Sequence, residues 1–167
     1  MLISPESLAV IGGAIALAGG LAGSSIGIGI AGSAGAATLS EEPGQLRNVI
    51  LLASLPMTQA FYGLITLILI LTTVIPKIPI LAANPELAVL PPGTEGFAVL
   101  GIGVITAAAE AFSGAYQGSV CASGISLLPK TKGRILTNAM MLAVFVELIG
   151  VLGLVFAIMA LAMLGLF

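Results

Sequence analysis

One carboxylate stands inside the last apolar stretch of the chain, at Glu147. It lies 13 residues after Arg134 and 20 before Phe167. On a helix, this spacing puts it roughly 20 Å from the basic turn that precedes the stretch, near the middle of a membrane. An ionised carboxylate costs several kcal/mol in hydrocarbon, so an acid at this depth indicates an ion or proton path. The structural alternatives are a permanently protonated acid that is hydrogen-bonded to a neighbour, or a polar spot that faces a lumen.

Oxygen-bearing side chains are expected at the same depth on two other helices. Thr58 and Tyr62 are four residues apart and share a helix face, and Gln59 lies beside them. Gln117 lies at a similar depth in the third apolar stretch. Hard cations such as Na⁺ prefer oxygen ligands of this kind, whereas a proton carrier needs only the acid and one hydrogen-bond partner. The cluster therefore favours Na⁺, with H⁺ as the alternative.

Pro56 precedes these side chains and interrupts the backbone hydrogen bonds of its helix. It has no N–H group, so the carbonyl of Leu52 loses its usual donor and can point toward the cluster.

Composition requires a membrane around these elements. Of 167 residues, 59% are hydrophobic and 7% are charged, with a mean hydropathy of +1.23, whereas a soluble domain needs about a quarter of its residues charged.

Five Lys or Arg residues, without a basic cluster, exclude a nucleic-acid footprint. A single cysteine, Cys121, and no histidine exclude an internal disulfide and a His/Cys metal centre. A Gly-rich phosphate loop followed by Lys is missing, so we expect no nucleotide binding and no catalytic activity.

Four transmembrane helices fit the length, and we expect an all-α membrane protein. The expected helices are about 5–39, 45–74, 94–128 and 135–166. We divide the chain into a first hairpin (1–75), a proline-rich connecting loop (76–96) and a second hairpin (97–167). The first helix lacks a basic region before it, so we interpret it as a mature span and not as a removable signal.

The two hairpins are interpreted as copies of one unit. Sliding the chain by 90 positions, or by 89 in the first helix, aligns identical residues, and the loop positions and helix lengths also match, which favours duplication over chance. The pairs are Asn48 and Asn138, Leu52 and Leu142, Ala53 and Ala143, Gly63 and Gly153, Gly29 and Gly118, and Gly35 and Gly124. Glu147 falls on Met57, so only the second hairpin keeps the acid.

Basic residues set the expected orientation. Those beside the two short loops are Arg47, Lys130, Lys132 and Arg134. Only Lys77 lies in the expected central loop. The positive-inside rule then makes loops 40–47 and 129–134 cytoplasmic and leaves both chain ends and the 76–96 loop extracytoplasmic.

Small residues repeat at helical spacing in the first and third helices. Gly19, Gly23 and Gly27 are four apart, and Gly114 and Gly118 repeat the spacing. Small residues let helix backbones touch in lipid. This pattern fits ordinary packing in a four-helix bundle, but the number of glycines favours the tightly curved inner wall of a ring.

Three segments, LPMTQAFYG at 55–63, QGSVCASG at 117–124 and VE at 146–147, resemble the rotor-ring protein of V-type and A-type rotary ATPases, which is also named the K subunit, the c subunit or the proteolipid. The resemblance spans nearly the whole chain. It implies a ring of identical subunits in a prokaryotic cell membrane. This ring would turn against a membrane stator subunit that supplies an arginine, with central-stalk subunits at the cytoplasmic loops and ATP hydrolysis or synthesis in a soluble head.

The sodium-binding branch of this family implies a set of ligands here. These are the backbone carbonyl of Leu55 and the side chains of Thr58, Gln59, Gln117 and Glu147, with Tyr62 hydrogen-bonded to the carboxylate. Whether Leu52 or Leu55 offers its carbonyl stays open, because proline distortion can turn either inward. A structural or pore-forming proteolipid without a rotary role, or a secondary transporter, are the interpretations from outside this family.

Glu110 departs from the family pattern. It lies seven residues before Gln117, nearly on the same helix face and about 10 Å further out. We consider a protonated packing residue, a group facing water in the lumen, or part of an ion path.

Overall fold

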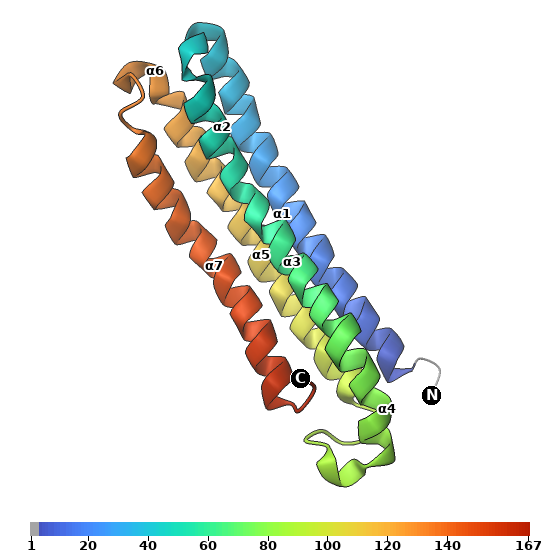
Figure 1. Ribbon diagram of the computed structural model, residues 1–167. Helices are drawn as coiled ribbons and strands as arrows, with labels where there is room; N and C mark the ends of the chain where they lie inside the picture. Colours follow the sequence, from blue (N-terminus) through green and yellow to red (C-terminus); the bar gives the residue numbers. More distant parts are fainter. Residues whose placement is uncertain (1–3) are drawn as a thin grey trace.

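The computed structural model describes residues 4–167, and within them all regular secondary structure is helical, with no strand. Four continuous helical stretches, Pro5–Glu41, Pro43–Ala83, Glu95–Ser126 and Leu136–Met163, are long and apolar enough to cross a membrane. They lie side by side as a long bundle with short connections at its ends (Figure 1). The expected all-α membrane fold is therefore confirmed.

Helix α1 (Pro5–Glu41) begins as the sequence predicts. The Ser4 hydroxyl accepts a hydrogen bond from the Ser7 N–H at 3.2 Å, and Pro5 occupies the first turn. Glu42 then stops α1, and the 3₁₀ turn Pro43–Gln45 leads directly into the second span.

The second span consists of several helical segments. Helix α2 (Leu46–Ser54) passes through a 3₁₀ turn (Leu55–Met57) into α3 (Thr58–Leu69), and a π-helical turn (Ile70–Val74) leads to α4 (Ile75–Ala83). The 3₁₀ turn surrounds Pro56, whose missing N–H breaks the regular pattern of backbone bonds. The proline therefore changes the local winding and does not end the helix.

The expected loop 76–96 is wrong in its first part, because the helix continues to Ala83. The π-helical turn lets a new helical segment, α4, start at Ile75. Pro76 therefore lies in a first helical turn, where the missing N–H group has no cost. Pro79 is accommodated inside α4. The non-helical connection reduces to residues 84–94 around a short 3₁₀ turn, Pro85–Leu87.

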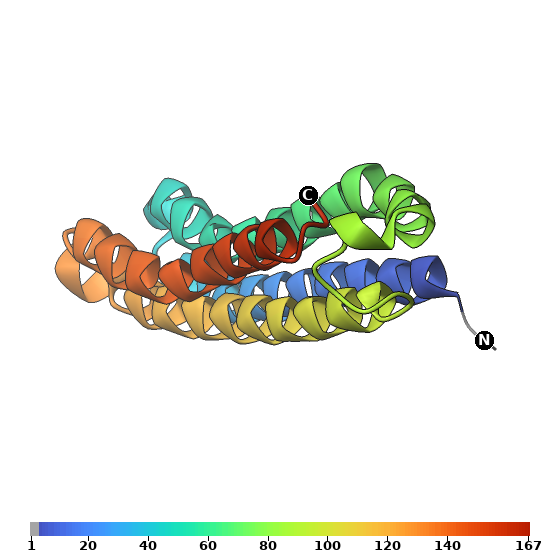
Figure 2. The same cartoon turned by 90° about the horizontal axis from the view of Figure 1, so that it is seen from below.

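Helices α1 and α5 (Glu95–Ser126) run parallel and form one layer of the bundle, while the second span and α7 (Leu136–Met163) form the other (Figure 2). The contact between α1 and α5, here named the glycine seam, consists of glycines that face each other. Gly12 lies against Gly103, Gly23 against Gly114, and Gly27 against Gly118, so closely that a methyl group on any of these would overlap the facing backbone.

The duplicated hairpins also pack in an equivalent way. In the first hairpin, a Cβ on Gly35 would meet the Val49 side chain, and in the second a Cβ on Gly124 would meet the Ala139 side chain. These two contacts are related by the same offsets of 89 and 90 positions that align the sequence. Within the second hairpin, α6 (Leu128–Thr131) and a left-handed turn connect α5 to α7.

The glycine seam predicts a sharp positional difference between two substitutions on α5. Gly103→Ala should destabilise the detergent-solubilised protein by about 1–3 kcal/mol, because the new methyl group overlaps the Gly12 backbone. Gly101→Ala lies two residues away, where no atom of another helix of the chain lies within 4 Å. In the single chain dissociated from the ring, this second substitution should leave stability unchanged or slightly raised. Thermal unfolding of both variants checks this, and equal effects would contradict it.

Candidate functional site

The Glu147 carboxylate is held by groups from two other helices. Its Oε1 accepts a hydrogen bond from the Tyr62 hydroxyl of α3 at 3.1 Å, and its Oε2 accepts one from Gln117 Nε2 of α5 at 3.3 Å. Glu147 itself is half-buried, and its α7 neighbours Phe145 and Leu148 are exposed. The carboxylate therefore lies where three helices meet, near the outer surface of the bundle.

Two buried amides continue this network inward. Gln59 and Gln117 are fully buried. Gln59 Nε2 donates to Gln117 Oε1 at 3.0 Å and to the Ser113 hydroxyl at 3.1 Å. Both amide hydrogens of Gln59 are used in this way, which leaves its Oε1 directed toward the Thr58 hydroxyl at 3.3 Å.

The turn at Pro56 supplies a backbone oxygen to the same cluster. The Leu55 carbonyl lies 3.4 Å from the Thr58 hydroxyl. The Leu52 carbonyl instead accepts a hydrogen bond from the Leu55 N–H at the start of the 3₁₀ turn. Of the two carbonyls that the sequence left open, the one that reaches the cluster is that of Leu55.

All six groups expected from the sequence are thus brought together in one hydrogen-bonded cluster. They are the Leu55 carbonyl, Thr58, Gln59, Tyr62, Gln117 and Glu147. Amide, hydroxyl and carbonyl oxygens surround a single acid, and within residues 4–167 no group of three His, Cys, Asp or Glu side chains forms an alternative metal site. The donor set suits a small hard cation better than a transition metal.

Two serines that the sequence analysis did not single out support this cluster. The Ser113 hydroxyl, 2% exposed, accepts from Gln59 and donates to the Val146 carbonyl at 3.0 Å, so it joins α3 to the backbone beside Glu147. Ser24 of α1 accepts from the Ala60 N–H at 2.9 Å. The sequence does contain a signal for these two serines, because the offset of 89 positions aligns Ser24 with Ser113.

Glu110 lies outside the hydrogen-bonded cluster. Its side chain is fully buried, and neither carboxylate oxygen has a hydrogen-bond partner among the described residues. Gly150 and Gly153 of α7 make the room that it occupies, since a Cβ on Gly150 would lie 2.8 Å from Glu110 Oε2 and one on Gly153 would lie 3.2 Å from Oε1. This burial excludes the lumen-facing interpretation within the isolated chain.

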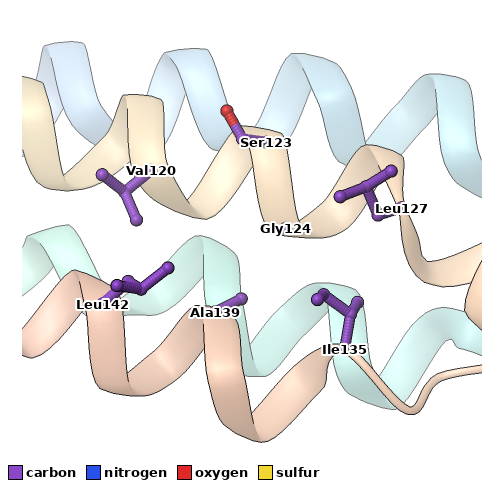
Figure 3. A pocket seen from close by; sticks show the side chains of 7 residues that line it. All are labelled: Val120, Ser123, Gly124, Leu127, Ile135, Ala139 and Leu142. Carbon is purple, nitrogen blue, oxygen red and sulfur yellow. The ribbon is translucent and has the colours of Figure 1, made fainter.

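A pocket of about 280 Å³ lies between the C-terminal half of α5 and the start of α7 (Figure 3). Its lining is mainly apolar and consists of Val120, Ser123, Gly124, Leu127, Ile135, Ala139 and Leu142. None of the groups around Glu147 faces it, so this pocket is separate from the polar cluster.

Comparison with known proteins adds independent evidence. The model of the family described as the C subunit of ATP synthase matches residues 11–70 and residues 100–160. The starts and ends of these ranges are 89 and 90 positions apart, which agrees with the duplication found in the sequence and in the packing.

Two curated relatives cover most of the chain. V-type sodium ATPase subunit K of Enterococcus hirae is 32% identical over 133 residues, which cover 80% of this chain and 76% of the relative. A-type ATP synthase subunit K of Methanocaldococcus jannaschii is 31% identical over 170 residues, 94% of this chain and 74% of the relative. The chain therefore belongs to the family of the ATP synthase C subunit, as a non-catalytic rotor-ring protein that forms homo-oligomeric rings within V-type and A-type ATPases.

Proposed function

We propose that the ring formed by this chain carries Na⁺ across the membrane, one ion at each Glu147. The observation that carries the proposal is the oxygen cluster contributed by three helices around a single acid. A proton carrier would need only Glu147 and Tyr62, and the buried pair Gln59 and Gln117 would then have no role at the site. The similarity to a relative named as a sodium ATPase subunit supports the same choice.

The proposed ligands are the Leu55 carbonyl, the Thr58 hydroxyl, Gln59 Oε1, Gln117 and the Glu147 carboxylate. Gln59 fits this role because its two amide hydrogens are already used by Ser113 and Gln117, which leaves Oε1, the acceptor of the Thr58 hydroxyl, as the atom that would face the cation. Tyr62 holds the carboxylate through Oε1, while Gln117 holds Oε2. No positively charged side chain lies near Glu147 in the sequence of its span, so the cation itself supplies the counter-charge.

Translocation then follows from charge neutrality. Glu147 with bound Na⁺ is a neutral pair that tolerates contact with lipid, whereas the bare carboxylate does not. We propose that the empty site is confined to an interface with a stator subunit whose arginine stabilises the anion. Central-stalk subunits would bind at loops 40–47 and 129–134 on the cytoplasmic side, with both chain ends outside. ATP hydrolysis or synthesis in the soluble head would be coupled to the rotation.

Carbodiimide labelling of Glu147 in the purified ring tests the choice of ion. Because the reagent modifies a protonated, accessible carboxyl, Na⁺ at millimolar concentration should slow the labelling at moderate pH, while K⁺ at the same ionic strength should not. Labelling that depends on pH alone, with equal rates in both salts, would favour the proton-carrying ring. Mass spectrometry of the labelled chain gives the rate and the modified residue.

Glu147 and Glu110 should respond differently to replacement by glutamine. Glu147→Gln should abolish ion-coupled ATP turnover and leave the ring assembled, because the amide keeps the shape of the site and cannot neutralise a cation. Glu110→Gln should retain turnover, because Glu110 makes no hydrogen bond to the cluster. Turnover in proteoliposomes measures both, and loss of turnover in Glu110→Gln would instead place this acid on the ion path.

Ser113 should act on Na⁺ affinity through Gln59. Ser113→Ala removes the hydrogen bonds to Gln59 and to the Val146 carbonyl. The bond that orients Gln59 is worth about 1 kcal/mol, so the half-saturating Na⁺ concentration should rise by about three- to tenfold. The same substitution should have little further effect in a Gln59→Ala background, because the amide that it orients is then missing. Additive effects in the double variant would show that Ser113 acts on the fold and not on the site. Ser119→Ala, at an exposed position of α5, is the matched control.

A further inference from the structure

The contact between α1 and α5 inside one copy of the chain provides a template for the contact between neighbouring copies. The two helices are equivalent, so a ring of such chains places α5 of one copy next to α1 of the following copy, as α1 lies next to α5 within the chain. Inside the chain, the face that α1 presents to α5 consists of Gly12, Gly19, Gly23 and Gly27.

The equivalent face of α5 is found 89 positions later. It consists of Gly101, Ala108, Phe112 and Tyr116, and all four are exposed in the isolated chain. Phe112 and Tyr116 are each 63% exposed. Where the first hairpin uses two glycines to bring helices together, the second hairpin carries two aromatic side chains that its own chain leaves largely exposed.

Shifting the residues of α5 back by 89 positions gives the face of α1 that would contact α5 of the neighbouring copy. Within the chain, α5 meets α1 through Gly103, Gly114 and Gly118. Their equivalents on α1 are Ala14, Ser25 and Gly29, and all three are exposed. No atom lies within 4 Å of a Cβ placed on Gly29. This face is therefore open and lined by small residues.

We propose that Phe112 and Tyr116 of α5 pack against the Ser25 and Gly29 face of α1 in the next copy of the chain. The register follows from the template, in which Gly27 meets both Gly114 and Gly118. Its equivalent, Tyr116, then meets the equivalents of those two residues, Ser25 and Gly29 of the next copy. Phe112 lies one turn earlier, toward Ser25.

This arrangement makes the inner wall of the ring uneven. Within one copy, glycine faces glycine and the backbones touch, whereas between copies an aromatic ring of about 150–250 Å² of burial stands between them. The α5 helix of one copy and the α1 helix of the next copy are therefore further apart than α1 and α5 of one chain. The aromatic pair thus sets the spacing between copies, and with it the angle by which each copy is turned from the next.

Cysteine cross-linking of the assembled ring tests the register. In a Cys121→Ala background, the double variant Tyr116→Cys with Gly29→Cys should form disulfides between copies on mild oxidation, visible as a ladder of covalent multimers in denaturing electrophoresis. Each single variant should stay monomeric. The control pair Phe145→Cys with Gly29→Cys combines Gly29 with a residue that is 69% exposed on α7, in the other layer, and should give no ladder. An intact ring without a ladder for the first pair, or with equal ladders for both pairs, overturns the proposal.

Replacement of the aromatic pair tests the spacing. Phe112→Ala with Tyr116→Ala should change the number of copies per ring, or lower the temperature at which the ring dissociates, as measured by native mass spectrometry of the detergent-solubilised ring. Phe145→Ala, which removes an equally exposed aromatic side chain from α7, should leave both values unchanged. An unchanged ring mass and dissociation temperature in the double variant would exclude the aromatic pair as the spacer. Neither measurement depends on which ion Glu147 carries.

Discussion

A bare charge cannot remain in hydrocarbon, and the arrangement of every helix around Glu147 is consistent with this constraint. The acid sits near the outer surface of the bundle, yet each of its oxygens accepts a hydrogen bond from a different helix. Behind it, Gln59 and Gln117 are fully buried and hydrogen-bonded to each other. The half-buried carboxylate is in this way attached to a buried hydrogen-bonded interior and is not held by one side chain alone.

The glycine seam is what brings these groups within reach. Because α1 and α5 touch along their backbones, the helices that pack on them approach as well, and a glutamine from α3 can meet a glutamine from α5. The serines complete this arrangement, since Ser113 connects α3 to the backbone of α7 and Ser24 connects α1 to α3. Packing by small residues therefore also places the polar groups of the cluster.

The sequence predicts most of the fold, because hydropathy, loop residues and the internal repeat all point to the same four helices. It also identifies the polar groups of the site, since acids, amides and hydroxyls are rare in such apolar stretches. It fails at Pro76 and Pro79, because proline normally ends a helix and the π-helical turn that accommodates Pro76 has no simple sequence signal. The roles of Ser24 and Ser113 also depend on distances between helices, which no local pattern contains.

Duplication without conservation of the acid has a geometric consequence for a rotating ring. Met57, exposed to 46%, occupies the position in the first hairpin that Glu147 occupies in the second. In a ring of copies, two successive Glu147 residues are therefore separated by one outer helix, which carries Met57 in place of the acid. Under the proposed function, each ion then corresponds to twice the angle of rotation found in a ring of equal circumference with an acid in every hairpin, so half as many ions cross the membrane in each full turn.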